Sequence, residues 1–290
     1  KKALKESNLG FNKINGISAT AGPGLIVCLT VGLNAGKAIA GSLKKPFVAV
    51  NHLEGHALSP KINNKIKFPY LLLLISGGHT QFLEVKGVNN YKRLGTTIDD
   101  ALGEAFDKTA KLLGIEFPGG PKIEEWAKKG DENYFKLPKP ILKRGGCNLS
   151  FAGLKTAVLR TSKDLKNQKE KYHLAASFQK TINEILYEKT KIAMGEFLKD
   201  KKNIQKTFVI AGGVAANLKI RENLTKLSKE KKFSSIFPPI NLCGDNAAMI
   251  AWAGIERYKI NLINDLEFPS KARWPLDSSA PFLKGPGLKI

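Results

Sequence analysis

Cysteine is scarce in this chain of 290 residues. Its three cysteines, Cys28, Cys147 and Cys243, are too few and too scattered to form the disulfide framework of a small secreted protein. Free cysteines in such small number are typical of a reducing compartment, so we expect a cytoplasmic protein.

Long hydrophobic runs are also absent. The longest uninterrupted aliphatic run covers residues 71–75, whereas a helix that spans a bilayer needs about 20 apolar residues. Residues 1–6 contain three lysines and lack the apolar stretch of a signal peptide. We therefore expect neither a transmembrane segment nor a membrane partner.

Arginine is rare although the chain is strongly basic. Only six of its 47 basic residues are arginine, the net charge is +22, and the lysines are spread along the whole sequence. This charge fits a nucleic-acid partner, but it fits equally well a general lysine enrichment that keeps the surface soluble. The hydrophobic fraction of 42% and the charged fraction of 25% are those of a globular protein with two domains or one large one.

Short buried-strand patterns alternate with helical patterns along the chain. Residues 47–50, 70–75 and 208–211 are apolar runs that end in polar residues or glycine, and residues 81–85 follow as the returning strand of a hairpin. Strands that lead into helices through glycine turns indicate the α/β class. The helices that we expect cover residues 32–41, 99–113, 122–129, 172–197, 215–229 and 246–257.

Two histidines lie four residues apart, directly after the predicted strand 47–50. On a helix His52 and His56 share one face, so both imidazoles can reach one metal ion. The pattern differs from the zinc-protease motif, which needs glutamate directly after the first histidine, because Leu53 holds that place and Glu54 comes one residue late. The alternative is a chance pair at a helix start. Because the chain has only four histidines, we favour a metal site.

Three further loops carry candidate binding residues. The glycines of Ser76-Gly77-Gly78-His79 can expose backbone N–H groups to an anion, although an ordinary hairpin turn explains them as well. Gly212-Gly213 and Asn217 lie where a strand gives way to a helix, which suits a phosphate or a nucleoside but is also a plain turn. Asp245 is either a third metal ligand or a helix N-cap, and we expect Cys243 to be a small buried side chain.

Taken as an ordered set, these motifs resemble the TsaD family, the catalytic subunit of tRNA N6-adenosine threonylcarbamoyltransferase. The resemblance covers nearly the whole chain, and the motifs follow the family's order. The segments that carry it are His52-x3-His56, Ile75-Ser-Gly-Gly-His79-Thr, Asp99-Asp-Ala-x-Gly-Glu-Ala-Phe-Asp107, Phe117-Pro-Gly-Gly120-Pro, Ser150-Phe-Ala-Gly-Leu-Lys155, Gly212-Gly-Val-Ala-Ala-Asn217, Cys243-Gly-Asp245-Asn and Arg273-Trp-Pro-Leu.

The resemblance implies the fold shared by actin, Hsp70 and sugar kinases, in which two ribonuclease-H-like lobes enclose a cleft. The first lobe would cover residues 1–68, the second residues 69–242, and a C-terminal helix and tail at 243–290 would return to the first lobe. The family's opening hairpin, Gly-Ile-Glu-Thr-Ser-Cys-Asp-Glu-Thr, has no counterpart in this sequence. We therefore expect about three strands of the first sheet to be missing, which would leave an unpaired sheet edge.

The resemblance also implies a reaction. A threonylcarbamoyl group would pass from threonylcarbamoyl-AMP to N6 of adenosine 37 in tRNAs that read codons starting with A, and AMP would leave. His52, His56 and Asp245 would hold one divalent metal ion per subunit, with Fe(II) preferred to Zn. The residues that would bind the substrate are Ile75, Ser76, Gly77, Gly78, His79, Asp107, Gly120 and Asn217. No catalytic residue is assigned, but His79 is a candidate general base by its type, with loop fixation as an equal alternative.

The partners implied by the resemblance are tRNA, a TsaB-like paralogue, a TsaE-like ATPase and a TsaC-type enzyme that supplies the adenylate. Three rival functions stay open: a metalloprotease, which the position of Glu54 disfavours; an ATPase or sugar kinase of the same fold; and a catalytically inactive, truncated homologue. The paired histidines favour the catalytic subunit over its non-catalytic paralogue.

Overall fold

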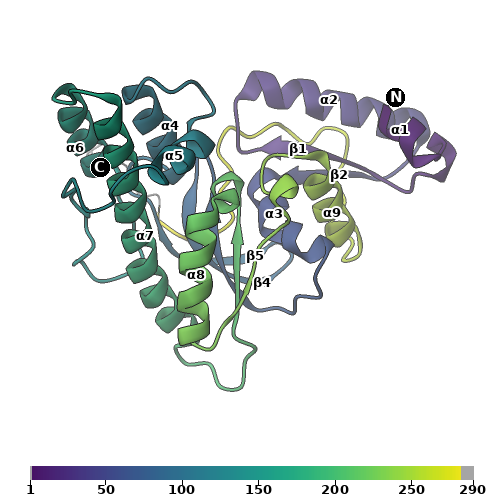
Figure 1. Ribbon diagram of the computed structural model, residues 1–290. Helices are drawn as coiled ribbons and strands as arrows, with labels where there is room; N and C mark the ends of the chain where they lie inside the picture. The colour runs from purple at the N-terminus through teal and green to yellow at the C-terminus, as the bar shows by residue number, and fades with distance from the viewer. Residues whose placement is uncertain (1, 282–290) are drawn as a thin grey trace.

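The computed structural model describes residues 2–281 and contains two β-sheets with helices packed against them (Figure 1). The smaller sheet has two strands and the larger sheet has five. Helices α4 to α8 gather at the larger sheet, and α2, α3 and α9 gather at the smaller one. The chain therefore has the α/β architecture that the alternating strand and helix patterns predict.

The smaller sheet follows a short N-terminal helix, α1 (Lys2–Ser7), and a 3-10 turn, η1 (Phe11–Lys13). Its strands β1 (Ile17–Gly22) and β2 (Phe47–Asn51) run parallel, and α2 (Ile26–Leu43) connects them. Helix and sheet approach closely at Gly36, where an added Cβ would lie 2.9 Å from the Ala19 side chain. Among the described residues, β1 pairs with no strand other than β2.

The larger sheet has the strand order β5-β4-β3-β6-β7. Its centre is β3 (Tyr70–Ile75), which runs parallel to β6 (Thr207–Ala211) and antiparallel to β4 (Thr80–Gly87). Every residue of β3 and β6 is buried, which is why both read as continuous apolar runs in the sequence. The outer strands are β5 (Asn90–Thr96) and β7 (Ser234–Ile236).

Helices cover both faces of the larger sheet. Leu71, Leu73 and Ile75 of β3 face the main core, which contains side chains of α4 (Leu102–Leu112), α5 (Gly119–Ala127), α6 (Ala152–Lys163), α7 (Gln168–Leu198) and α8 (Leu218–Glu230). The alternate residues Leu72 and Leu74 pack instead with Leu53 and Ala57 of α3 (His52–Leu58). Helix α3, which follows β2 of the smaller sheet, is thereby fixed against the larger sheet.

The last helix, α9 (Ala247–Tyr258), packs against β1, β2 and α3, far from its neighbours in the sequence. Short 3-10 turns complete the element list: η2 (Ser59–Ile62), η3 (Gly213–Ala216) and η4 (Ile240–Leu242). The division into lobes at residues 1–68, 69–242 and 243–290 stays a prediction, and residues 282–290 of the tail lie outside the described residues.

Several element boundaries differ from the predicted ones. The helix expected at 32–41 begins at Ile26, because the apolar residues after Gly24 continue the helix. The helix expected at 99–113 begins at Leu102, since the Asp99 carboxylate instead accepts hydrogen bonds from the backbone of Phe151 and Ala152. The helix expected at 122–129 begins at Gly119, because proline and glycine are tolerated in a first turn. Strands β1, β5 and β7 have no counterpart among the predicted strands.

Helix α2 differs from the sequence expectation in another respect. By length and composition it is apolar enough to cross a membrane, with a mean hydropathy of 1.5 and 22% of its residues buried. A helix of a soluble protein or a leader near the N-terminus passes the same test, so this is a weak indication.

Candidate metal and substrate site

Helix α3 carries the two histidines because it begins directly at the end of β2. The Asn51 side chain caps the helix by accepting a hydrogen bond of 2.9 Å from the Leu53 backbone N–H. His52 and His56 follow one turn apart, and their ring centroids lie 4.9 Å from each other. The predicted shared face of the pair is therefore present.

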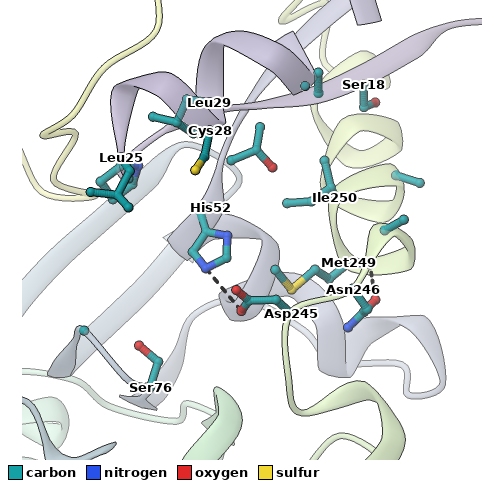
Figure 2. Close-up of a pocket in the computed structure, with 18 of the residues that line it drawn as sticks. Ser18, Leu25, Cys28, Leu29, His52, Ser76, Asp245, Asn246, Met249 and Ile250 are labelled. Atoms are coloured by element: carbon teal, nitrogen blue, oxygen red, sulfur yellow. Dashed lines mark hydrogen bonds and ion pairs between the residues drawn. The ribbon is translucent and has the colours of Figure 1, made fainter. Parts of the chain in front are cut away.

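Asp245 reaches the histidines from the loop before α9. Its Oδ1 lies 3.4 Å from Nε2 of His52 and 3.1 Å from Nε2 of His56 (Figure 2 draws the contact with His52). The cap of α9 is Asn246, whose side chain accepts from the Met249 N–H at 2.8 Å. The alternative interpretation of Asp245 as the helix cap is therefore wrong, and its carboxylate is free to face the imidazoles.

The buried His56 and the exposed Asp245 differ sharply in how much of their side chains solvent reaches. The His56 side chain is 1% exposed, whereas the Asp245 side chain is 75% exposed and borders open space. Hydrogen bonds with His52 and His56 hold the pKa of the Asp245 carboxyl well below its usual range. The acid is therefore charged at neutral pH, at a point where two imidazole nitrogens converge.

This donor set fits a divalent transition metal. One ligand atom from each of His52, His56 and Asp245 can be chosen so that all three lie within 4.8 Å of one another. Two imidazoles with one carboxylate are a ligand combination that suits Fe(II) or Zn and leaves coordination positions open for substrate. Among the described residues Nδ1 of His56 is buried without a hydrogen-bond partner, so the polar contact of that ring is at the Nε2 end, which faces Asp245.

The loop after β3 forms a tight turn beside this group. The Ser76 backbone N–H donates to the His79 carbonyl at 2.8 Å, and the His79 N–H donates to the Ser76 Oγ at 3.1 Å. Gly77 and Gly78 are exposed, and no atom of residues 2–281 lies within 4 Å of where their Cβ would be, their chain neighbours aside. Their backbone is therefore open to a ligand, as an anion-binding turn requires.

The imidazole of His79 takes up a proton less readily than that of a surface histidine. Burial, together with the nearby His52 and His56, lowers the pKa of the His79 imidazole to about 4. The side chain is therefore neutral at physiological pH.

A cavity of about 1090 Å³ brings part of the predicted site together. Its lining includes His52, Asp245 and all four residues of the Ser76–His79 turn. Figure 2 shows His52 and Asp245 pointing toward one another, with Cys28 of α2 and Leu25, which directly precedes that helix, on a separate wall. A second cavity of about 490 Å³ contains Asp107 and Gly119, and Gly77 borders both cavities. The Gly77 backbone is thus the junction between the histidine group and Asp107.

The other predicted substrate residues do not line these cavities. Ile75 is fully buried within β3, and neither it, Gly120 nor Asn217 lines either cavity. Asn217 caps α8 by accepting from the Ile220 N–H, and its Nδ2 donates to the Gln179 Oε1 at 2.8 Å. Asp107 accepts from the Gly119 N–H at 2.9 Å, while Gly120 faces open space.

Two cavity walls escaped the sequence analysis. Helix α2 contributes Cys28 and Leu29, its N-cap residue Leu25 lies beside them, and α9 contributes Met249 and Ile250. The signal that could have found them is position: α2 begins just after the Gly22-Pro23-Gly24 turn and α9 just after Asp245.

Cys243 and Glu54 take no part in the histidine group. Cys243 is 1% exposed, and burial raises the pKa of its thiol, which disfavours the thiolate that a metal ligand needs. The Glu54 carboxylate contacts Arg257 and Tyr91 instead of the cavity. The glutamate of a zinc-protease mechanism is therefore missing, as its position in the sequence predicts.

Comparisons with known proteins agree with one another. The family model described as tRNA N6-adenosine threonylcarbamoyltransferase matches residues 1–252. A protein of that name from Pelagibacter ubique (strain HTCC1062) is 67% identical over the whole chain, which covers 81% of the relative. One from Zymomonas mobilis is 51% identical, again over the whole chain and 79% of the relative.

Solved structures share the fold at low sequence identity. Full-length HypF in its phosphate- and nucleotide-bound form aligns with 89% of this chain and 40% of its own, with a TM-score of 0.61 and 13% identity. Component A of the Acidaminococcus fermentans (R)-2-hydroxyglutaryl-CoA dehydratase covers 89% of this chain and 81% of its own, with a TM-score of 0.51 and 14% identity. At such identity these neighbours show the two-lobe fold alone.

Proposed function

The chain belongs to the TsaD family of tRNA N6-adenosine threonylcarbamoyltransferases, and from this premise we propose how its residues perform the transfer. The reaction places a threonylcarbamoyl group on N6 of a tRNA adenosine. The single observation that carries this function is the 67% identity over the whole chain to a relative of that name, of which the chain covers 81%. The proposed donor is threonylcarbamoyl-AMP and the proposed acceptor is adenosine 37.

The chemistry defines what the protein must supply. The exocyclic amine of adenine is a weak nucleophile because its lone pair is delocalised into the ring. The acyl adenylate offsets this weakness, since AMP is a good leaving group. The protein must therefore align donor and acceptor and stabilise the charge that develops on the carbonyl oxygen.

His52, His56 and Asp245 are the proposed ligands of one divalent metal, Fe(II) in first place and Zn in second. Their convergent nitrogen and carboxylate atoms and the open side of the group support this assignment. Once bound, the metal would supply a Lewis acid and an anchor for the threonylcarbamoyl moiety. The wall from α3 and the loop before α9 would hold the donor's acyl end in the larger cavity.

The turn at Ser76, Gly77 and Gly78 is the proposed phosphate site. Its exposed glycine backbone lies between the larger cavity and the smaller cavity that contains Asp107. A donor bound with its phosphate at Gly77 would thus extend its acyl end toward the histidines and its nucleoside toward Asp107. We assign Asp107, Gly120 and Asn217 to the adenosine half, with Ile75 as the buried strand end that holds the turn.

His79 is the proposed acceptor of the proton that the adenosine amine loses. Its pKa of about 4 keeps the imidazole neutral and able to accept a proton. An imidazole with this pKa is a weak base, so it would take the proton from the strongly acidic cationic amine formed after attack. Its backbone bonds to Ser76 give it a second role in fixing the turn.

A TsaB-like paralogue and a TsaE-like ATPase are the proposed partners, with a TsaC-type enzyme as the source of the adenylate. The surface at the start of α2 supports a protein partner, because the N-cap residue Leu25 and the helical Val27 and Val31 are 77%, 78% and 71% exposed. An apolar surface of this kind commonly marks a protein interface. The tRNA substrate agrees with the net charge of +22.

The direct test is a transfer assay with the chain, its partner proteins, threonylcarbamoyl-AMP and an unmodified tRNA transcript. Mass spectrometry of the digested nucleosides should detect threonylcarbamoyl-adenosine with the wild type and not with His52→Ala. No transfer by the wild type, together with ATP hydrolysis that His52→Ala leaves unchanged, would contradict the proposal and favour an ATPase of the same fold.

A further inference from the structure

Glu54 is a fully buried carboxylate that the transfer chemistry leaves unexplained. It lies on α3 two residues from His52 and two residues from His56, and it is 0% exposed. A buried charge of this kind is costly unless partners satisfy it. Its position between the two histidines raises the question of what those partners are.

Each Glu54 oxygen has partners, and together they join three parts of the fold. The Arg257 Nε of α9 donates to Oε2. The Asn89 backbone N–H and the Tyr91 hydroxyl donate to Oε1 at 2.8 and 2.9 Å. Arg257 also donates through Nη2 to the Asn89 Oδ1 at 2.8 Å, which closes the network. Asn89 lies in the turn between β4 and β5, and Tyr91 lies on β5.

The elements that meet here are the ones that carry the proposed site. Helix α3 holds both histidines, and α9 begins two residues after Asp245. The third element is the β4–β5 hairpin, and β4 starts directly after His79. The network therefore connects the histidine helix, the helix that follows Asp245 and the hairpin that continues from the Ser76–His79 turn.

The network is better suited to fixing geometry than to adding stability. A buried ion pair contributes little net stability relative to a well-packed apolar pair, because both charges lose their hydration. The pair instead restricts geometry, because its hydrogen bonds form only at certain distances and angles and so favour one placement of α3 relative to α9. To bind one metal ion together, the two Nε2 atoms of α3 and the Asp245 carboxylate must each be placed to within about 0.5 Å, so the relative position of the helices matters at this point.

We propose that Glu54 and Arg257 are positioning residues for the metal group: their ion pair sets α3 against α9 and thereby sets His52 and His56 against Asp245. This inference rests on the proposed metal site. Neither residue touches the cavity, so both act through the histidines and Asp245.

The test compares two buried carboxylates. Glu54→Gln keeps the shape of the side chain and removes its charge. Glu84→Gln is the matched control, because Glu84 on β4 is 4% exposed and its Oε1 lies 3.2 Å from the Lys201 Nζ, away from the metal group. For each metal-free protein we would measure thermal unfolding and then Zn²⁺ affinity by competition with a chromophoric chelator.

Both variants should unfold at lower temperature than the wild type, since each loses half of a buried pair. Only Glu54→Gln should bind Zn²⁺ at least about tenfold more weakly, within the range found for residues that orient metal ligands. Tyr91→Phe provides a milder variant if Glu54→Gln does not fold. It removes the hydroxyl that donates to the Glu54 Oε1, and it should weaken Zn²⁺ binding about threefold. The Zn²⁺ affinity of Glu84→Gln should equal that of the wild type.

Unchanged Zn²⁺ affinity in Glu54→Gln and Tyr91→Phe would overturn the positioning role and leave the metal site standing. Equal weakening in Glu54→Gln and Glu84→Gln would also overturn it, because a general loss of stability would then explain both. Failure of the wild type to bind Zn²⁺ would instead contradict the proposed metal site, and with it this inference.

Discussion

At the scale of single residues, the site depends on side chains whose roles the sequence separates only in part. The spacing of His52 and His56 is a local property, so it could be predicted from the periodicity of a helix. The role of Asp245 could not, because a carboxylate before a helix fits both a cap and a ligand. The structure distinguishes the two through Asn246, which caps α9 itself.

The first prediction concerns Asp245. Asp245→Asn should lower the affinity for a divalent metal about a hundredfold, because a neutral amide is a much poorer ligand than a carboxylate. Its side chain is 75% exposed, so loss of its contacts with the histidines should lower the free energy of unfolding of the metal-free protein by at most about 1 kcal/mol. Isothermal titration with Zn²⁺ and urea unfolding check the two effects.

The exposed Asp164→Asn, at the end of α6, serves as the control and should bind Zn²⁺ like the wild type. Wild-type affinity in Asp245→Asn would exclude Asp245 as a ligand.

The second prediction concerns pH. The pKa of His79 is about 4 in the folded chain and near 6.5 in the unfolded chain. Above about pH 6.5 the imidazole is neutral in both states; as the pH falls below that value, the unfolded chain takes up the proton first. Stability is therefore lost between pH 6.5 and 4, by up to about 3 kcal/mol for this one group.

His79→Gln should abolish this part of the pH dependence. Urea unfolding of the metal-free proteins at pH 7 and pH 4.5 measures it, because the difference between wild type and variant removes the contribution of the carboxylates. Parallel loss of stability in the two proteins would contradict the burial of a neutral His79.

At the scale of elements, continuous apolar runs and long amphipathic patterns were predictable, while boundaries set by distant contacts were not. The central strands β3 and β6 lie where the sequence places them, and the long α7 is present but begins at Gln168, four residues before the predicted start. The start of α4 was misplaced because Asp99 binds the backbone at the start of α6, 52 residues away. Strand β5 was missed because its alternating pattern is interrupted by Lys92 and Arg93.

The third prediction tests how α4 supports the glycine turn. An added Cβ at Gly103 would lie 2.7 Å from the Ser76 carbonyl oxygen and 2.8 Å from the Gly77 Cα. Gly103→Ala should therefore displace the turn, cost about 1–3 kcal/mol of stability and raise the KM for the adenylate donor. Steady-state kinetics with varied donor concentration measure the change.

Gly195→Ala on α7 is the matched control, since in the described part of the chain no atom outside its own helical turn lies within 4 Å of its Cβ position. It should stabilise the helix by about 0.5–1 kcal/mol and leave KM unchanged. A normal KM in Gly103→Ala would show that the turn does not bind the donor.

The fourth prediction concerns the exposed face of α2. A partner that covers Val27 and Val31 should be lost from Val31→Asp, because the new charge would be buried in the interface. Co-purification with the TsaB-like paralogue measures this, and binding should fall at least tenfold. Leu159→Asp on α6, where the side chain is 41% exposed, should leave binding intact. Undiminished binding in Val31→Asp would place the interface elsewhere.

At the scale of the whole molecule, the site is built from segments that the chain brings together over long distances. His56 and Asp245 are 189 positions apart, and α9 reaches α3 only because it packs on β1 and β2. Periodicity and spacing describe each segment but not which segments meet. The resemblance of ordered motifs supplied that information, which is why the metal group could be anticipated while the Glu54–Arg257 network could not.

The most direct test of the central claim is the dependence of threonylcarbamoyl-adenosine formation on added metal. Metal-free protein, with its partner proteins, donor and tRNA, would be titrated with Fe(II) under anaerobic conditions, and the modified nucleoside would be quantified by mass spectrometry. Product should rise with added Fe(II) and reach a plateau at one equivalent per chain, and Asp245→Asn should give little product throughout. Full product formation by the metal-free wild type, or by Asp245→Asn, would contradict the account.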